Sequence, residues 1–273
     1  MVRESQRRKA YEVEIDAARE KFIKGHKLCG GTGFIKKSVK SKGSGFARQT
    51  VEHCKCRKKF DIVSKFIISN IPYKSLVNQQ IYGKLVTDIA AKDKIELRKE
   101  VIRPYIKHLK KAIKYPYGFL FLGKNGTGKT FIGLKILYYA VIMGFTAYNI
   151  EMADFLKLAR KLFDRDPDTE RLLNEILSVD ILMVDEIGNE SKRSSYVISE
   201  FKSLYKKRVS MGKPTILITN YSYKDFNIVY GKSIHNMVQS HCRIFDFSEA
   251  ADVRKTKCSG EMDLFFKKIK RRK

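Results

Sequence analysis

Acidic residues are scarce in this sequence: 29 Asp and Glu stand against 56 Lys and Arg, which leaves a formal net charge of +27. Such an excess says little about the fold, but it favours a polyanionic partner, with nucleic acid ahead of an anionic membrane. Residues 1–60 hold 17 basic and 6 acidic residues, and residues 254–273 hold 9 and 2. We therefore expect two strongly basic ends around a more balanced middle.

Long apolar runs are also missing. No stretch approaches the ~18 apolar residues of a membrane-spanning helix, and the longest run, Leu137 to Phe145, is broken at Gly144. The opening MVRESQRRKA has no apolar stretch behind its charges, which predicts no secretory signal. The 5 cysteines are odd in number and clustered, which argues against a disulfide scaffold. These absences predict a reducing, cytoplasmic setting and no contact with a membrane.

Hydrophobic residues make up 43% of the 273 residues, which is enough to bury a sizeable core in about two domains. From Tyr117 onward, short apolar strands alternate with longer amphipathic helices, which is typical of a parallel α/β sheet. We predict strands at about 117–122, 145–150, 180–185, 214–219 and 243–247, and helices at about 129–142, 151–163, 168–177, 194–210 and 230–240.

The composition divides the chain into four parts. Residues 1–60 combine a charged helix at 4–24 with a glycine- and lysine-rich segment too polar to fold around a core of its own. Residues 61–115 form a helical linker in which Pro104 kinks or restarts the helix. Residues 116–253 form the α/β core, and residues 254–273 form a basic tail.

The segment GKNGTGKT matches the phosphate-loop pattern G-x-x-x-x-G-K-[ST] at every fixed position, with an apolar strand before it and a helix after it. Its glycines let the backbone wrap a phosphate at the positive end of the helix. Lys129 would reach the β and γ phosphates of ATP, and Thr130 would ligate Mg²⁺. The predicted nucleotide site comprises Gly123, Asn125, Gly126, Thr127, Gly128, Lys129 and Thr130.

Two later strands end in polar side chains that ATP hydrolysis can use. Four apolar residues lead to Asp185, which would hold Mg²⁺, and Glu186 follows as a candidate general base. Asn220, at the tip of TILITN, could bond the attacking water or the γ-phosphate, with an ordinary turn residue as the alternative. A small-molecule kinase is disfavoured because it needs a second binding region and a mobile lid.

Two short pairs of metal-ligating residues lie near the N-terminus: His26 with Cys29, and Cys54 with Cys56. Tetrahedral zinc takes four nitrogen or sulfur ligands from two tight turns, and the glycines after Cys29 would let the first turn close. His53 could replace His26, but it directly precedes Cys54 and would strain the chelate. The alternative is reduced surface cysteines in a basic loop. We predict a Zn²⁺ site at His26, Cys29, Cys54 and Cys56.

With these motifs in order, the C-terminal two thirds resemble the helicase-loader ATPases of the DnaC and DnaI type and the IstB transposition ATPases. The matching stretches are GFLFLGKNGTGKT, SVDILMVDEIG and LYKKRVSMGKPTILITN. Many phage and mobile-element members carry an N-terminal C-x-x-C-G-G-T-G…C-x-C zinc module. HKLCGGTGF…HCKC looks like it, with His26 where the first cysteine is usual. The resemblance extends over residues 26 to about 254.

The resemblance implies a P-loop AAA+ core of RecA-like fold with a parallel five-stranded sheet and no separate lid domain, preceded by a small zinc-binding domain. It also implies roles for Lys129, Thr130, Asp185, Glu186 and Asn220 as assigned above. Two further residues carry over only by position. Arg208 stands where the family has an arginine near the subunit interface, and is a candidate catalytic residue. Arg254 falls near the family's nucleotide-sensing arginine.

One departure concerns the arginines that the family presents to the neighbouring subunit's ATP. This sequence has Ser233 and Met237 in those places. An arginine finger contributes ~10³–10⁵ in rate. Either Lys232, Arg208 or Arg243 substitutes, or hydrolysis is slow and ATP acts mainly as an assembly switch.

The resemblance therefore predicts an ATP-dependent helicase loader in DNA replication. Such a protein binds ATP–Mg²⁺, assembles with copies of itself on single-stranded DNA, and holds a replicative ring helicase through its N-terminal module. Two alternatives stay open. One is an IstB-like transposition ATPase, and the other is a zinc-dependent DNA-binding adaptor with weak or no ATP hydrolysis.

Overall fold

The computed structural model describes residues 14–21, 23–40, 47–72, 101–164, 166–189 and 194–250. The chain divides into two compact units, Met1–Tyr73 and Lys74–Lys273. Each unit has a hydrophobic cluster of its own. Within the described residues, no helix is long and apolar enough to cross a membrane.

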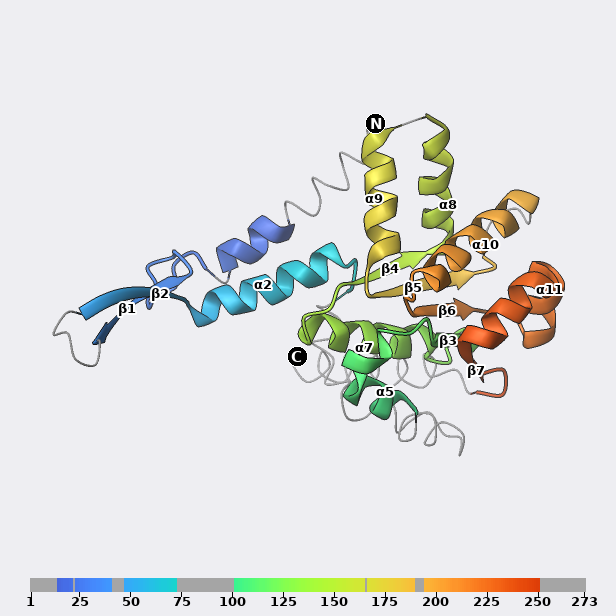
Figure 1. The fold of residues 1–273 in the computed structure, drawn as a ribbon, viewed down its shortest axis with the longest axis horizontal. Coiled ribbons are helices and arrows are strands. Elements are labelled where there is room, and N and C mark those ends of the chain that lie inside the picture. The colour runs from blue at the N-terminus through green and yellow to red at the C-terminus, as the bar shows by residue number, and fades with distance from the viewer. Residues whose placement is uncertain are drawn as a thin grey trace, which may run out of the picture. The chain divides into compact units, whose positions relative to one another are not determined.

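The second unit is built on a five-stranded parallel sheet with the strand order β4-β5-β6-β3-β7 (Figure 1). All five predicted strands are present, with ends within two residues of those expected. Every residue of β3 and β6 is buried, since helices cover both faces of the sheet. The strands are β3 (Gly118–Leu122), β4 (Ala147–Glu151), β5 (Ile181–Ile187), β6 (Thr215–Thr219) and β7 (Cys242–Asp246).

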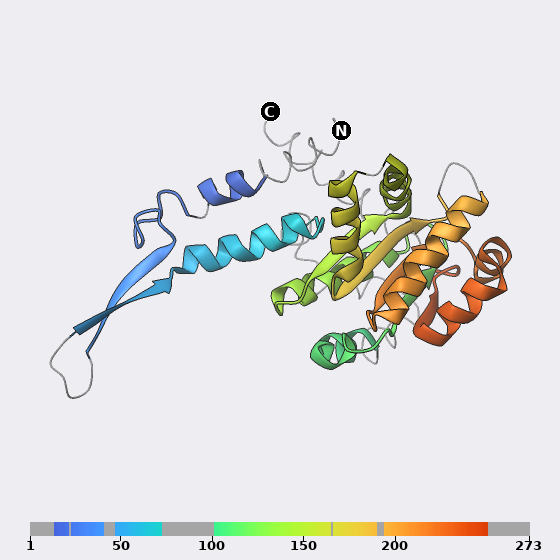
Figure 2. The ribbon, with the colours of Figure 1, turned by 45° about the horizontal axis from the view of Figure 1, so that its top comes forward.

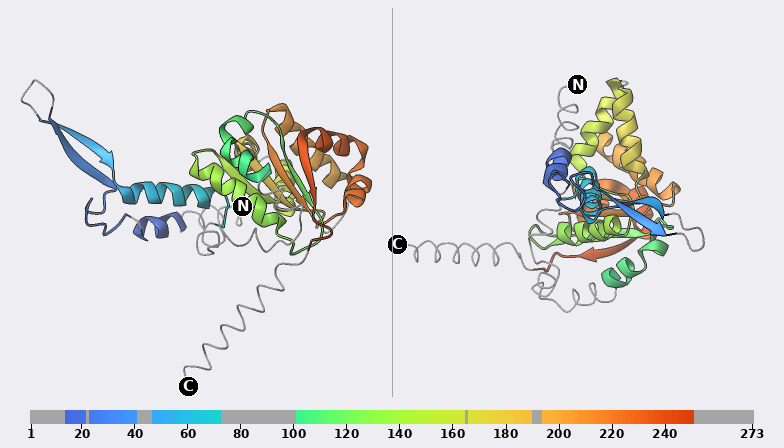
Figure 3. Two further views of the ribbon diagram at one scale, coloured as in Figure 1. Left: turned by 90° about the horizontal axis from the view of Figure 1, so that it is seen from below. Right: turned by 90° about the vertical axis from the view of Figure 1, so that its left-hand side faces the viewer.

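Helices form a layer on each side of this sheet (Figure 3). On one side, Gly133 of α7 (Lys129–Ile142) packs against Met183 of β5, and Tyr105 of α5 (Arg103–Lys107) contacts Phe119 of β3 with ring centroids 4.8 Å apart. The short helix α6 (Leu109–Ala112) follows α5. Pro104 lies in the first turn of α5, where no backbone N–H is required, so it restarts the helix as one of the two predicted outcomes.

Among the described residues, four helices lie on the other side of the sheet, and α8 and α9 run side by side there (Figure 2). These helices and the sheet enclose the hydrophobic cluster of the second unit. Because successive strand residues point to opposite faces, Leu120 and Leu217 belong to this cluster while Phe119 does not. The 3₁₀ helix η2 (Leu162–Asp164) extends α8. The four helices are α8 (Met152–Lys161), α9 (Pro167–Ser178), α10 (Ser195–Ser210) and α11 (Tyr223–His241).

Helix α11 begins well before residue 230, where the sequence predicted its start. Its N-cap is Ser222, whose hydroxyl accepts from the Asp225 N–H at 3.1 Å and donates to the Asp225 carboxylate at 2.7 Å. The prediction missed this cap because Asn-Tyr-Ser was interpreted as a loop. Gly231, with φ of 76° and ψ of 168°, interrupts the helix close to the predicted start.

The first unit contains a β-hairpin that the sequence analysis did not predict. Strand β1 (Phe34–Lys40) pairs antiparallel with β2 (Ala47–His53), and helix α2 (Lys55–Ile68) follows. Neither strand alternates apolar and polar residues, so the usual strand signal is absent. Residues 14–21 are helical, and Ala18 packs with Ile23, Phe60 and Ile67.

The observed division differs from the expected boundaries. Helix α2 continues past residue 60, and the division of the chain falls between Tyr73 and Lys74. The expected boundary at 253, the basic tail at 254–273 and the residues where a lid domain would follow the sheet lie outside the described residues.

Candidate nucleotide and metal sites

The phosphate loop joins β3 to α7 and has the backbone conformation that its glycines predict. Gly123, Gly126 and Gly128 have φ values of 109°, 79° and 90°, in the left-handed region that other residues rarely adopt. A Cβ on Gly123 would lie 2.5 Å from the Ser248 backbone nitrogen, so no larger residue fits there. These glycines give the loop the backbone conformation that an anion cradle requires.

Lys129 is the first residue of α7 and its side chain is folded into this loop. Its ammonium donates to the carbonyl oxygens of Gly123 and Lys124, each at 2.6 Å, and lies 3.5 Å from the Thr127 hydroxyl. Only 5% of the residue is exposed. The positive charge is therefore held at the centre of the loop, where a bound phosphate would meet it.

Asp185 lies near the carboxyl end of β5, close to Thr130. Burial raises the pKa of the Asp185 carboxyl, although the Glu186 N–H and the Thr130 hydroxyl both donate to it and oppose the rise. Nearby Glu186 and Glu151 raise it further. A divalent cation would stabilise the charged form of this carboxylate, and the hydroxyl and carboxylate oxygens are the hard ligands that Mg²⁺ prefers. The residues fit Mg²⁺.

Glu186 is turned out of the strand by a β-bulge. Val184 pairs with Leu217 and Ile187 with Thr219, so two residues of β5 stand opposite the single intervening residue of β6. Glu186 takes a left-handed conformation there, with φ of 55°, which is rare for a residue other than glycine. The bulge re-aims the carboxylate, and such strain is common where a side chain must be presented.

Two amides hold the Glu186 carboxylate by the same oxygen, Oε2. Asn220 Nδ2 donates to it at 3.3 Å, and Asn189 Nδ2 donates to it as well. The structure thus brings together Glu186 and Asn220, which the sequence predicted as partners in catalysis. Asn189 was missed, because an exposed amide in the loop after β5 carries no pattern. Its position three residues after the candidate base was the available signal.

Tyr221 is hydrogen-bonded both to the loop that follows β5 and to the phosphate loop. Its hydroxyl donates to the Gly188 carbonyl at 3.1 Å, and its own carbonyl accepts from the Gly123 N–H at 3.2 Å. Next to it, the Thr219 hydroxyl donates to the Ile187 carbonyl at 2.6 Å and fixes the far side of the bulge. The ends of β3, β5 and β6 therefore form one connected edge.

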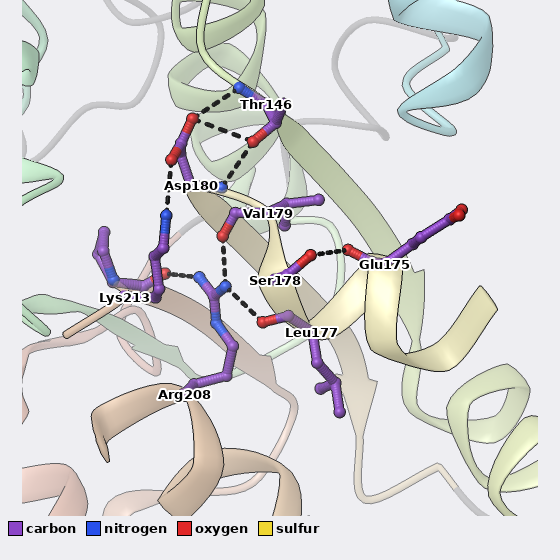
Figure 4. A network of polar contacts seen from close by, with 9 residues as sticks. Thr146, Glu175, Leu177, Ser178, Val179, Asp180, Arg208 and Lys213 are labelled. Carbon is purple, nitrogen blue, oxygen red and sulfur yellow. Dashed lines mark hydrogen bonds and ion pairs between the residues drawn. The ribbon is translucent and has the colours of Figure 1, made fainter. Parts of the chain in front are cut away.

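Arg208 does not lie at this edge, which corrects its predicted catalytic role. The side chain is fully buried, and its guanidinium donates to the carbonyl oxygens of Leu177 and Val179 (Figure 4). It also donates to the Pro214 carbonyl oxygen and to the Thr215 hydroxyl. These groups lie at or just before the amino ends of β5 and β6, about 20 Å along the strand from Glu186. With its donors satisfied inside the fold, Arg208 cannot reach a neighbouring subunit.

The other arginine and lysine candidates differ in placement. Lys232 is exposed and directly follows the break at Gly231, and Arg243 is exposed on β7 with its guanidinium 5.7 Å from the Phe245 ring centroid. Both are accessible to another molecule. Arg254, the predicted nucleotide-sensing residue, lies outside the described residues.

His26, Cys29, Cys54 and Cys56 converge in the first unit, with all four candidate ligand atoms within 4.8 Å of one another. His26 Nδ1 lies 3.5 Å from Cys29 Sγ and 3.6 Å from Cys54 Sγ, and the sulfurs of Cys29 and Cys56 are 3.5 Å apart. Zinc bonds of about 2.3 Å to sulfur and about 2.0 Å to nitrogen give tetrahedron edges of about 3.5–3.8 Å. The residues fit zinc in number, chemistry and spacing.

The thiols of this cluster shift one another's pKa values. Burial alone raises the pKa of Cys29, but the Gly33 N–H, which donates to its sulfur at 3.4 Å, and its other partners lower that pKa to about 6. Burial and the neighbouring sulfurs raise the pKa of Cys56 to about 12. His53, the alternative ligand, lies apart from the cluster on β2, with its ring centroid 5.2 Å from that of Phe34.

Comparison with known proteins shows which family and which relatives the second unit is similar to. Residues 113–248 match the family described as IstB-like ATP binding protein. The replicative helicase loader DnaC of Buchnera aphidicola subsp. Baizongia pistaciae is 31% identical over 120 residues, which cover 42% of this chain and 48% of that protein. DnaC of Escherichia coli K12 is 30% identical over 119 residues, covering 42% and 47%.

The crystal structure of DnaI aligns with a TM-score of 0.51 at 16% identity, covering 64% of this chain and 93% of that one, and so shares the fold. The chain spans about half the length of the curated relatives it matches.

Proposed function

We propose that this chain, which matches the IstB-like ATP binding protein family through residues 113–248 and is similar to DnaC loaders over 42% of its length, is an ATP-dependent helicase loader of DNA replication. In this role it hydrolyses ATP, assembles with copies of itself on single-stranded DNA and delivers a replicative ring helicase. The observation that carries the proposal is the edge where Lys129, Asp185, Glu186 and Asn220 converge, tied together by Tyr221.

The reaction at that edge follows from the side chains. Lys129 and the loop N–H groups would bind the β and γ phosphates, while Thr130 and Asp185 would hold Mg²⁺, which neutralises charge on the phosphate oxygens. Glu186 takes a proton from a water as the water oxygen bonds the γ-phosphorus. The bond from that phosphorus to the bridging oxygen breaks, leaving ADP and phosphate. Asn220 orients the water and the base.

Steady-state ATP hydrolysis with and without single-stranded DNA tests this function. Glu186→Gln should lower kcat by ~10²–10⁴, as expected for loss of a general base, while ATP binding persists. Glu175→Gln makes the same chemical change on the exposed face of α9 and should leave turnover unchanged. Hydrolysis at the wild-type rate in Glu186→Gln would rule out the assigned base.

DNA contact is supported by a cluster of aromatic and basic side chains from α8, η2 and α10. Phe163 is 76% exposed, its ring centroid lies 6.4 Å from that of Tyr196, and the Arg160 guanidinium is 5.3 Å from the Tyr196 centroid. Exposed rings beside cations are the elements on which unpaired bases stack. Phe163→Ala should weaken binding to single-stranded DNA severalfold, measured by fluorescence anisotropy.

In the first unit, we propose that His26, Cys29, Cys54 and Cys56 bind one Zn²⁺ that holds the hairpin against α2. Zinc content measured by mass spectrometry should approach one equivalent per chain. Cys54→Ser should lower it, whereas Cys242→Ser, which changes a buried thiol of the other unit, should not. Less than half an equivalent in the carefully purified wild-type protein would contradict the assignment.

The partner separates the loader from its alternatives. A loader should bring down a replicative ring helicase, and a transposition ATPase, which the IstB-like family match favours, should bring down a transposase. Ser233 and Met237, in place of arginines, favour an adaptor with little hydrolysis. An adaptor would keep its biological activity in Lys129→Ala, which abolishes ATP binding.

A further inference from the structure

We propose that Tyr115, Tyr117 and His241 form a second surface for single-stranded nucleic acid, at the edge of the sheet opposite the ATP site. Tyr117 directly precedes β3 and His241 is the last residue of α11 before β7, so both lie at the amino ends of their strands. The phosphate loop follows the carboxyl end of β3, about 16 Å away along the strand. This surface is therefore separate from the nucleotide site and from Phe163.

The three rings form a continuous stack. The Tyr115 and Tyr117 rings are inclined by 15° with centroids 6.0 Å apart, and the Tyr117 and His241 rings by 24° with centroids 6.4 Å apart. Tyr115 is 56% exposed and Tyr117 is 58% exposed. Such exposure is unusual for neighbouring aromatic side chains, which gain more from burial. Near-parallel, exposed rings present the faces on which successive bases stack.

The rings are also held in position. Tyr105 of α5 donates its hydroxyl to the Tyr117 carbonyl at 3.5 Å, and its ring packs on Phe119 of the buried strand β3. The His241 Nδ1–H donates to the Met237 carbonyl oxygen at 2.9 Å, which fixes the ring at the end of α11. A platform that is already ordered loses little conformational freedom when a strand binds.

Charge selects a polyanion for this surface. Between residues 101 and 150 the chain has no Asp or Glu, and the segment that leads from α5 through α6 to Tyr115 carries five exposed cations. Lys114 is next to Tyr115, and Lys110 and Lys111 lie one turn earlier on α6. A neutral protein surface would not match this density of positive charge, and an acidic one would match the charges but offer no bases to the rings, whereas a nucleic acid strand offers both phosphates and bases. The exposed cations are Arg103, Lys107, Lys110, Lys111 and Lys114.

The contributions of ring stacking and of charge can be separated by the salt dependence of binding. Binding of a fluorescent oligo-dT of about 20 nucleotides is measured by anisotropy over a range of salt concentrations, with oligo-U as a second arm to distinguish DNA from RNA. The double variant Tyr115→Ala and Tyr117→Ala should weaken binding by at least about tenfold at every salt concentration, with an unchanged salt slope. The triple variant Lys110→Gln, Lys111→Gln and Lys114→Gln should reduce the slope of log K against log salt by about 2.

Controls keep the result interpretable. Tyr115→Phe with Tyr117→Phe retains the ring faces and should bind as the wild type does. ATP turnover without DNA should be unchanged in every variant, which shows that the core is folded. Because Tyr117 adjoins β3, Tyr115→Ala alone provides a milder test with a smaller loss.

Affinity within twofold of the wild type in the tyrosine double variant, or an unchanged slope in the lysine variant, overturns the proposal. Loss of binding in Phe163→Ala but in neither of these variants would confine the strand to the Phe163 cluster and overturn it too. A wild-type protein that binds no single-stranded oligonucleotide removes both DNA surfaces but leaves the hydrolysis assigned to Glu186 standing, so the two proposals fail separately.

Discussion

Single residues decide whether the ATP-binding edge is catalytic, and Glu186 is the clearest case. Its left-handed backbone and the bulge around it place the carboxylate beside two amides. The sequence predicted Glu186 and Asn220 because each ends an apolar strand, and strand ends at one edge of a parallel sheet must meet. It could not predict Asn189, because the course of a loop depends on contacts that no periodic pattern encodes.

We expect Asn189 to position Glu186, so Asn189→Ala should lower kcat for ATP about tenfold while KM stays unchanged, since the amide touches the base and not the nucleotide. In a Glu186→Gln background the same change should have no further effect, as a single-turnover assay can measure. The matched control is Asn174→Ala, which removes an amide on α9 that accepts a hydrogen bond from Lys207 of α10. A rise in kcat would mean that Asn189 restrains the base instead.

At the scale of elements, burial explains which predictions succeeded. Strands β3, β5 and β6 are covered on both faces, so they appear in the sequence as apolar runs bounded by turns. Strands β1 and β2 belong to a hairpin whose neighbouring cluster consists of metal-ligating residues, and their polar sequence hides them. Arg208 was misassigned because sequence position alone cannot tell which end of a strand a side chain on the neighbouring helix will reach.

Arg208 joins α10 to the amino ends of β5 and β6, where burial lowers the pKa of its guanidinium to about 9. Arg208→Ala should destabilise the protein by at least about 3 kcal/mol, because it leaves several buried acceptors without a donor. Urea unfolding measures this change. Lys232→Ala, at an exposed position, should shift stability by less than about 0.5 kcal/mol. A stable Arg208→Ala protein with reduced kcat would instead restore the catalytic interpretation.

At the scale of the whole molecule, the chain consists of two compact units with different sources of stability. The second unit has a large apolar cluster, whereas the first has a small one and a set of metal-ligating side chains. A small core generally needs a disulfide or a metal to remain folded. The basic residues at the two ends, on which the charge argument began, lie mostly outside the described residues.

Removal of zinc should therefore unfold one unit and spare the other. In Cys56→Ser, we expect DNA-free ATP turnover to stay within twofold of the wild type, because none of the catalytic residues belongs to the first unit. Amide hydrogen exchange should become fast in β1, β2 and α2 while β3, β5 and β6 remain protected. Loss of ATP turnover in this variant, with the sheet still protected, would show that the units are coupled.

The tyrosine that follows Asn220 has a consequence for timing. Tyr221 contacts the phosphate loop through its backbone carbonyl and the loop after β5 through its hydroxyl. Its ring leaves no space for a side chain at Gly188. Tyr221 therefore links the two loops, one through its backbone and the other through its side chain, and we expect a displacement of one loop to be accompanied by a displacement of the other. Arrival of the nucleotide and alignment of the base would then be parts of a single movement.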